Sequence, residues 1–164
     1  MKLRTLCLLI QWACATSLAL CDSSWAGDGP PGSVERGRYV AIVANCMSCH
    51  TAGFVAAGGS IPEDTWFTGS LVGFRSQVGT TYAPNLRLYF QQVSEDEWLS
   101  VARSTTYRRP MPWWSLREMT DDDLVAIYRY VRSMGPKGTP APSFLPPGQE
   151  PPRPYIDLPS PPSR

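Results

Sequence analysis

The alternation of apolar and polar positions predicts three helices in this chain. The first covers residues 34–49, where apolar side chains recur at helical spacing and Arg36 and Arg38 mark the solvent side. Its core-facing stripe is predicted to consist of Tyr39, Val40, Ile42 and Val43. The second helix has the sequence EDEWLSVARS, and Ser94 with Glu97 forms the capping box that begins it.

The third helix has the sequence DDDLVAIYRYV and also begins at a predicted capping box, made by Thr120 and Asp123. Its buried stripe is predicted to be Leu124, Ile127, Tyr128 and Val131. Gly135 and Pro136 end the helix, because glycine accepts the backbone of a helix terminus and proline cannot continue the hydrogen bonding.

The middle of the chain, residues 51–93, lacks sustained periodicity and is rich in Gly, Ser, Thr and aromatic residues. More than forty residues without regular structure are unusual inside a compact domain. We therefore expect these loops to enclose a large apolar group that is not protein. Such a group would complete the apolar core, for which three helices are too few.

The two ends of the chain differ in composition from the helical part. Residues 1–26 have a basic tip, an apolar run and a small-x-small site at their end, which is typical of a secretory signal peptide. A retained anchor and lipidation at Cys21 are the alternatives. One domain is predicted at 27–135, followed by a proline-rich tail at 136–164. The tail holds eleven of the 17 prolines and is predicted to be extended and polyproline-like.

Removal of the signal peptide would simplify both charge and cysteine content. Equal numbers of acidic and basic residues would remain, so no overall charge favours a nucleic-acid partner. Of the five cysteines only Cys46 and Cys49 would remain. A single local pair is not the disulfide framework of a small exported domain.

These two cysteines lie in ANCMSCHTAG, directly before His50, the only histidine of the chain. C-x-x-C-H is the attachment signature of haem c. Cys46 and Cys49 stand about one helical turn apart, so both thiols can add to the vinyl groups of one porphyrin. His50 follows directly, so its imidazole can ligate the iron.

Other interpretations of the motif are weaker on chemical grounds. Zinc needs at least three well-spread protein ligands, and three residues this close in sequence do not span a tetrahedron easily. A thiol–disulfide oxidoreductase would place its cysteine pair at a helix N-terminus after a strand, whereas this pair comes near the end of a predicted helix. A structural disulfide between Cys46 and Cys49 leaves His50 unexplained.

If His50 is the fifth ligand of the iron, the sixth cannot be a second histidine. A methionine, Lys137 or an open position remains. Met47 lies inside the attachment motif, on the same side as the thiols. Met119 and Met134 occupy helix ends, where an apolar residue usually packs.

Met111 is placed differently, because Pro110 and Pro112 flank it in RRPMPWWS. Neither proline can donate a backbone hydrogen bond, and Pro112 favours an extended backbone at Met111. The segment is predicted to be a stiff, non-helical strap that holds a thioether at a fixed distance from the iron. We therefore predict Met111 as the sixth ligand.

Taken together, these segments resemble class I c-type cytochromes. RGRYVAIVANCMSCHTA and PMPWWSLREMTDDDLVAIYRYVRSMGP carry the resemblance, with TYAPNL between them. More narrowly, the chain is similar to monohaem c subunits that serve periplasmic dehydrogenases, such as quinoprotein alcohol or aldehyde dehydrogenases. The resemblance implies an all-α fold in which the first and last helices cross and loops wrap one covalently bound haem c.

The resemblance also implies roles for individual residues. Cys46 and Cys49 match the thioether sites. His50 matches the proximal ligand and Met111 the distal one. Pro84 matches the proline of a loop whose backbone typically accepts the imidazole proton and so orients the ring.

Two departures from the family pattern alter the expected haem edge and partner surface. After TYAPNL, the segment RLYFQQVSEDEW replaces a Thr-Pro-Asp sequence with a Gly-rich link, and STTYRRP is shorter than the usual Gly-rich stretch before the methionine. Asn85 and Arg109 are expected to reach a haem propionate or neighbouring backbone. Aromatic residues are expected to line the haem pocket, namely Trp66, Phe67, Trp113 and Trp114.

Such a site implies one-electron outer-sphere transfer through an exposed haem edge, with no catalytic residue. We expect a periplasmic carrier that accepts electrons from a dehydrogenase and passes them to another cytochrome or a terminal oxidase. A haem c sensor or peroxidase with an open sixth position is the alternative, followed by a C-x-x-C thiol–disulfide oxidoreductase. The tail is expected to be a solvated extension, or to anchor a partner through Phe144 and Tyr155.

Overall fold

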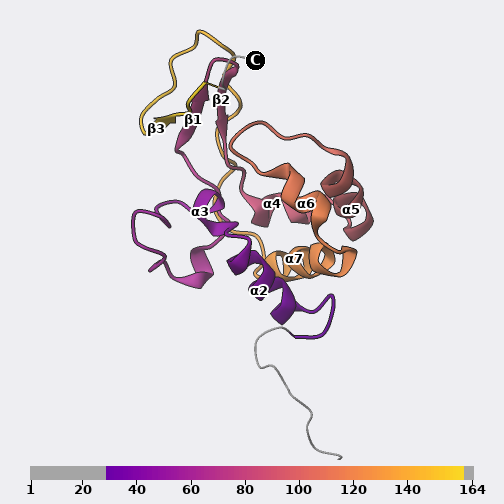
Figure 1. Cartoon of the computed structure of the whole chain (residues 1–164). Coiled ribbons are helices and arrows are strands. Elements are labelled where there is room, and N and C mark those ends of the chain that lie inside the picture. The colour runs from indigo at the N-terminus through magenta and orange to yellow at the C-terminus, as the bar shows by residue number, and fades with distance from the viewer. Residues whose placement is uncertain (1–28, 161–164) are drawn as a thin grey trace, which may run out of the picture.

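The computed structural model describes residues 29–160, so the predicted signal peptide and Cys21 lie outside the described residues. In chain order the elements are α2 (Val34–Val43), α3 (Met47–His50), the 3-10 helix η1 (Glu63–Thr65), β1 (Gly73–Ser76), β2 (Gly79–Tyr82), α4 (Leu86–Gln92), α5 (Glu95–Ser104), α6 (Trp113–Glu118), α7 (Asp121–Ser133) and β3 (Tyr155–Asp157). The first and last long helices, α2 and α7, pack against each other, and α4 and α5 also pack on α7 (Figure 1). Between residues 29 and 160, no helix combines the length and apolar character needed to span a membrane.

The all-α prediction is wrong in one respect, because a small sheet accompanies the helices. β1 and β2 form an antiparallel hairpin, and β3 pairs in parallel with β1, which gives the order β2-β1-β3. The hairpin turn is Gln77-Val78, which lacks the Asn-Gly or Asp-Gly pair that marks such turns in a sequence. β3 comes from the tail, and Arg75 lies opposite Asp157, 82 positions later. No local pattern predicts a pairing over that distance.

The middle segment is also more regular than predicted, since it contains η1, the hairpin and α4. α4 begins at Asn85, whose side-chain oxygen accepts a hydrogen bond from the Leu88 amide at 3.1 Å. Phe90 on α4 is 1% exposed, and its ring centroid lies 5.0 Å from that of Trp98 and 5.3 Å from that of Tyr128. The segment that departs from the family pattern therefore forms part of the core.

Arg87, in the same segment, completes the end of α7. It is 5% exposed and donates to the carbonyl oxygens of Gly135 and Asp64, each at 2.6 Å, and also to that of Met134. The last carbonyls of a helix have no partner inside the helix. The buried Arg87 guanidinium donates hydrogen bonds to two of the carbonyls at this end. Its positive charge also interacts favourably with the negative end of the helix dipole.

The predicted first helix is in fact two helices, because the chain turns at Asn45. Asn45 has a positive φ of 56°, its amide donates to the Ile42 carbonyl, and the Cys46 amide donates to the Ala41 carbonyl. This pair of hydrogen bonds is the Schellman motif, for which asparagine is one of the few suitable residues. The turn starts α3 in a new direction, directly at the haem motif.

The predicted apolar stripe of the first helix is wrong for three of its four residues. Val40 is buried, but Tyr39 and Ile42 are each 38% exposed and Val43 is 60% exposed. The buried face of α2 consists instead of Gly37, Val40 and Ala41. Small residues face α7 because the two helices approach too closely for larger side chains, and a Cβ atom at Gly37 would overlap the Ala126 carbonyl.

The predictions of the other two helices are confirmed, and so is the buried face predicted for the last one. α5 covers Glu95–Ser104 and begins at a complete capping box of Ser94 and Glu97. All four predicted residues of α7 are buried, namely Leu124, Ile127, Tyr128 and Val131. At its start, Thr120 accepts a hydrogen bond from the Asp123 amide. The predicted capping box is incomplete, because the Asp123 carboxylate binds Arg36 of α2 at 2.7 Å instead. This ion pair ties the two crossing helices together.

The substitution Gly37→Ala tests the close contact of α2 and α7. Alanine favours an isolated helix by about 1 kcal/mol over glycine. We nevertheless expect the free energy of unfolding to fall by about 2–4 kcal/mol, because the methyl group would force the helices apart. Denaturant unfolding of the haem-loaded protein measures the change. Glu35→Ala, at an exposed position of the same helix, is the control, and equal stability of all three proteins would contradict the packing.

Candidate haem-attachment site

The C-x-x-C-H motif forms the short helix α3 and the N-cap residue before it. Cys46 is the N-cap of α3, while Cys49 and His50 lie in its single turn. Both thiols are partly exposed and are not joined in a disulfide. Burial raises the pKa of the Cys46 thiol to about 11. The expectation that the pair lies near the end of a helix is wrong, because Cys46 stands at the start of α3. A thiol used in disulfide exchange has a lowered pKa, however, whereas that of Cys46 is raised.

His50 is held in the orientation of an iron ligand. Its ring is buried, with 6% exposure, and Nδ1 lies 2.9 Å from the Pro84 carbonyl oxygen. A carbonyl only accepts hydrogen bonds, so Nδ1 carries the proton and Nε2 keeps its lone pair for a metal. Burial lowers the pKa of His50, partly opposed by the bond to Pro84, which favours the neutral form that coordinates.

Gly69 and Ser70, for which the sequence predicted no role, connect His50 to the segment that carries the Pro84 carbonyl. The Gly69 amide donates to the His50 carbonyl at 2.8 Å, and the Ser70 amide donates to the Ala83 carbonyl at 3.2 Å. Gly69 has a φ of +84°, and a Cβ atom there would lie 2.9 Å from the Asn85 amide nitrogen. Only glycine fits this position, but a lone glycine in an aperiodic segment gives no signal of its role.

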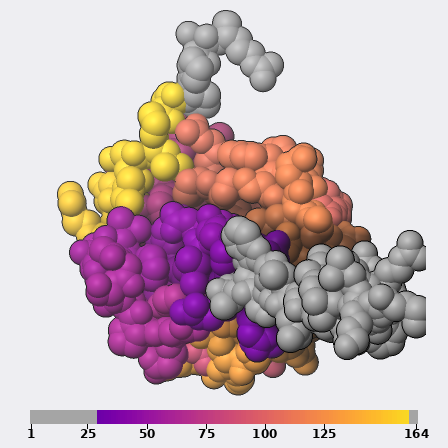
Figure 2. Space-filling view, turned by 60° about the horizontal axis from the view of Figure 1, so that its bottom comes forward, coloured from indigo at the N-terminus to yellow at the C-terminus, as the bar shows by residue number. Residues whose placement is uncertain are grey.

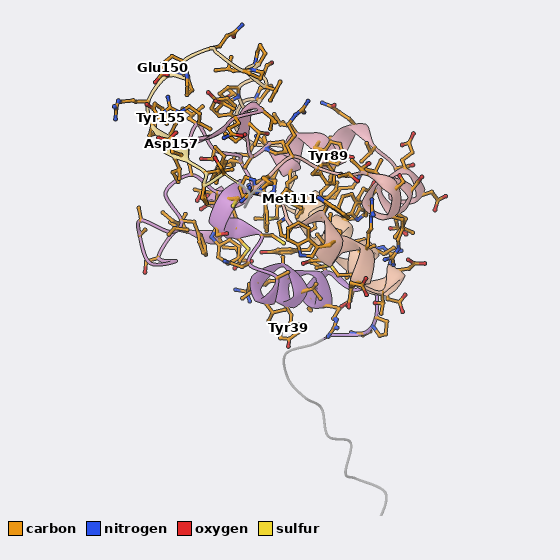
Figure 3. All side chains as sticks on the ribbon, turned by 45° about the horizontal axis from the view of Figure 1, so that its top comes forward. Tyr39, Tyr89, Met111, Glu150, Tyr155 and Asp157 are labelled. Carbon is orange, nitrogen blue, oxygen red and sulfur yellow. The ribbon has the colours of Figure 1, made fainter. Side chains whose placement is uncertain are left out.

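Met111 lies in a non-helical strap between α5 and α6, as its proline neighbours predicted. Its amide donates to the Arg108 carbonyl at 3.2 Å, and its carbonyl accepts from the Trp113 amide at 2.9 Å. The side chain is half-buried and packs against the same core cluster as Cys46. Figure 3 shows Met111 near the middle of the molecule, whereas Tyr39 points outward from α2.

The other candidates for the sixth iron ligand lie in the core, at helix ends or in an ion pair. Met47 is 2% exposed in the core, and Met119 and Met134 pack at the ends of α6 and α7. The Lys137 ammonium forms an exposed ion pair with Asp64 at 2.7 Å. Met111, Met119 and Met134 all pack partly buried against the core cluster, so Met111 as the sixth ligand stays a prediction.

The residues expected at the haem edge have partners in the protein backbone. The Asn85 amide nitrogen donates to the carbonyls of Lys137 and Thr139, and Arg109 donates to the carbonyl of Pro159. Of the aromatic residues, Trp66 and Phe67 belong to the core cluster, whereas Trp114 is 53% exposed. Their part in lining a haem pocket stays a prediction.

Two buried polar side-chain atoms, the Tyr82 hydroxyl and Arg117 Nε, have no hydrogen-bond partner in the part of the chain that the structure describes. An unpaired buried donor costs about 1–3 kcal/mol, and so requires an explanation. Tyr82 is the last residue of β2 and lies two residues before Pro84, whose carbonyl accepts the His50 proton. Two thiols, an imidazole and a thioether are the donor set of haem c.

The zinc interpretation finds no support in the arrangement of possible ligands. In the part of the chain that the structure describes, no three His, Cys, Asp or Glu side chains are grouped to hold a metal ion. A structural zinc site needs four such ligands.

Comparison with known proteins decides the family. The model of the cytochrome c family matches residues 34–135, from the start of α2 to just beyond the end of α7. The chain belongs to the cytochrome c family. Its cofactor is therefore covalently bound haem c, and its chemistry is electron transfer. The match supports a class I cytochrome fold, to which this chain adds a small sheet.

The similar curated proteins are components of dehydrogenases, most of them cytochrome subunits, which confirms the narrower resemblance. The cytochrome c subunit of the quinone alcohol dehydrogenase of Gluconacetobacter polyoxogenes is 29% identical over 115 residues, covering 63% of this chain and 22% of that protein. A nicotinate dehydrogenase subunit of Pseudomonas putida is 30% identical over 132 residues, covering 70% and 10%. The fructose dehydrogenase cytochrome subunit of Gluconobacter japonicus is 26% identical over 121 residues, covering 67% and 23%.

The chain spans less than a quarter of the length of these three relatives. No solved structure matches it at a significant level.

Covalent attachment can be tested by removing the two thiols. We expect Cys46→Ala with Cys49→Ala to abolish the covalent haem completely, because no thioether can form. Intact-mass measurement and haem staining after denaturing electrophoresis, on protein from cells with a haem c maturation system, detect the loss. Ser48→Ala, which lies between the two cysteines, is the control and should keep the full haem mass. Covalent haem on the double variant would show that the attachment site is elsewhere.

Proposed function

We propose that this protein is a monohaem electron carrier that accepts single electrons from an exported dehydrogenase and passes them to the respiratory chain. One observation carries the proposal. His50 is buried with Nδ1 committed to the Pro84 carbonyl, which leaves Nε2 available to the iron of a haem attached at Cys46 and Cys49. When bound, haem supplies a one-electron Fe(III)/Fe(II) couple.

In this proposal the protein's residues hold the iron rather than perform chemistry on a substrate. His50 and Met111 would hold the iron of a bound haem, and no iron position would then remain open to a substrate. A thioether favours the ferrous state more than a second imidazole does, and therefore raises the reduction potential. No residue is required as a general acid or base, and the protein is not itself an enzyme.

The proposed donor follows from the relatives, which are named as cytochrome subunits of alcohol and fructose dehydrogenases. We place the donor outside the cytoplasm, in agreement with the signal peptide proposed at residues 1–26. The acceptor is proposed to be another cytochrome or a terminal oxidase. Because encounters between electron carriers must be brief, we expect small interfaces with both partners.

Replacement of the proposed distal ligand tests Met111 directly. We expect Met111→Leu to remove the weak far-red absorption band of ferric iron bound to sulfur and to lower the midpoint potential by on the order of 0.1 V. Leucine has nearly the volume of methionine and cannot ligate iron. Met119→Leu is the matched control and should keep both band and potential. Loss of the band in the control instead would assign the ligand to Met119.

The electron-transfer role is tested with the oxidised holoprotein and a periplasmic fraction of the native host. Ethanol, fructose and nicotinate are supplied one at a time, and reduction of the haem is followed by its visible spectrum. We expect rapid reduction with at least one substrate and none without substrate. Peroxide turnover by the purified protein, without such reduction, would favour a peroxidase instead.

A further inference from the structure

The proline-rich tail is not a free extension, because it lies along the hairpin of the domain (Figures 1 and 2). Thr80 and Leu145 exchange two backbone hydrogen bonds, of 2.8 and 3.0 Å. Further along, the Leu158 amide donates to the Arg75 carbonyl at 2.8 Å. The tail is extended, as its prolines predicted, but it is fastened to the domain at several points.

The end of the tail is held by an exposed group of charges around Arg75. The guanidinium binds the carboxylates of Asp157 at 2.5 Å and Glu150 at 2.7 Å, and lies 4.3 Å from the centroid of the Tyr155 ring. Figure 3 shows Glu150, Tyr155 and Asp157 together at one end of the molecule. Exposed ion pairs stabilise weakly one by one, so this end depends on the group as a whole.

The start of the tail is hydrogen-bonded to Asn85, the residue after Pro84, whose carbonyl accepts the His50 proton. Asn85, which directly follows Pro84, is buried and donates from its amide nitrogen to the carbonyls of Lys137 at 2.8 Å and Thr139 at 3.2 Å. Any displacement of residues 137–139 therefore acts on the loop that orients the histidine.

The middle and end of the tail contact the strap that carries Met111. The centre of the Arg108 guanidinium lies 3.9 Å from the centroid of the Phe144 ring, which is a cation–π contact. Arg109 donates to the Pro159 carbonyl at 3.3 Å. The Arg108 carbonyl in turn accepts the hydrogen bond from the Met111 amide. Phe144 is thus linked through Arg108 to Met111, the proposed iron ligand.

The hairpin tip, the strap and the tail meet at one place. Residues of all three line a cleft of about 150 Å³, among them Val78, Arg108 and Pro159. Gly79 allows the tail to approach this closely, since a Cβ atom there would overlap the Leu145 carbonyl and the Phe144 ring. The close contact between the hairpin and the tail therefore depends on glycine at position 79.

We propose that residues 136–160 form an internal brace that holds the His50 loop and the Met111 strap in a fixed relation. Within it, Phe144 is a positioning residue for Met111. This inference rests on the proposed ligation of the iron by His50 and Met111. Because Phe144 restrains Arg108, and Arg108 is bonded to the Met111 backbone, the brace opposes displacement of the thioether from the iron.

The brace is tested by competition between Met111 and added imidazole for the ferric iron. Phe144→Leu removes the aromatic ring beneath Arg108 but keeps an apolar side chain. We expect it to raise the apparent affinity for imidazole by about threefold to tenfold, as expected for loss of one cation–π contact. Disappearance of the far-red sulfur–iron band reports the displacement.

Two further variants separate positioning from general destabilisation. Tyr155→Leu is the matched control, because it removes an aromatic ring from Arg75 of the hairpin rather than from Arg108 of the strap, and does not alter the Pro159 carbonyl that accepts from Arg109. Its imidazole affinity should equal that of the unaltered protein, even if its free energy of unfolding falls as much as that of Phe144→Leu. Truncation after Pro140 keeps the contacts of Asn85 and should raise the affinity at least as much as Phe144→Leu.

The outcomes distinguish this inference from the proposed function. An unchanged imidazole affinity in Phe144→Leu, or an equal rise in Tyr155→Leu, overturns the brace while the sulfur–iron band of the unaltered protein still supports Met111 as ligand. Absence of that band from the unaltered protein overturns both the ligation and the brace.

Discussion

The hydrogen bond from His50 Nδ1 to the Pro84 carbonyl organises the domain around it. It determines which ring nitrogen carries the proton, and thereby leaves the other nitrogen for the iron. The bond is useful only if its acceptor cannot move. Much of the surrounding structure serves that purpose, with Gly69 tied to His50 on one side and closely packed against Asn85 on the other.

The places where the chain departs from the family pattern are part of this support. The segment after TYAPNL folds into α4, which puts Phe90 into the core and Arg87 at the carboxyl end of α7. α7 in turn packs on α2, which leads into the haem motif through the turn at Asn45. The departures therefore change how the haem site is supported, while the motif that binds haem stays intact.

The tail takes a comparable part on the other side of the proposed site. Its prolines prevent helix formation, and hydrogen bonds to the hairpin, to Asn85 and to Arg109 fasten it to the domain. A segment with few internal contacts is ordered here because the domain supplies its partners. Most residues of 136–160 are solvent-exposed, as expected, but the tail is fastened to the domain, which composition cannot predict because it describes a segment alone and not what it contacts.

Features whose cause lies within a few residues could be predicted from the amino-acid order: the haem motif, the helices α5 and α7, the buried face of α7, and the non-helical strap at Met111. Helical periodicity, capping residues and proline act locally, so they leave a pattern along the chain. Contacts across the fold were needed to establish the buried face of α2, where Gly37 meets Ala126, and the pairing of β1 with β3. The same is true of Gly69, which lies between His50 and Asn85. These features depend on residues far apart in sequence, for which no local pattern of apolar and polar positions carries a signal.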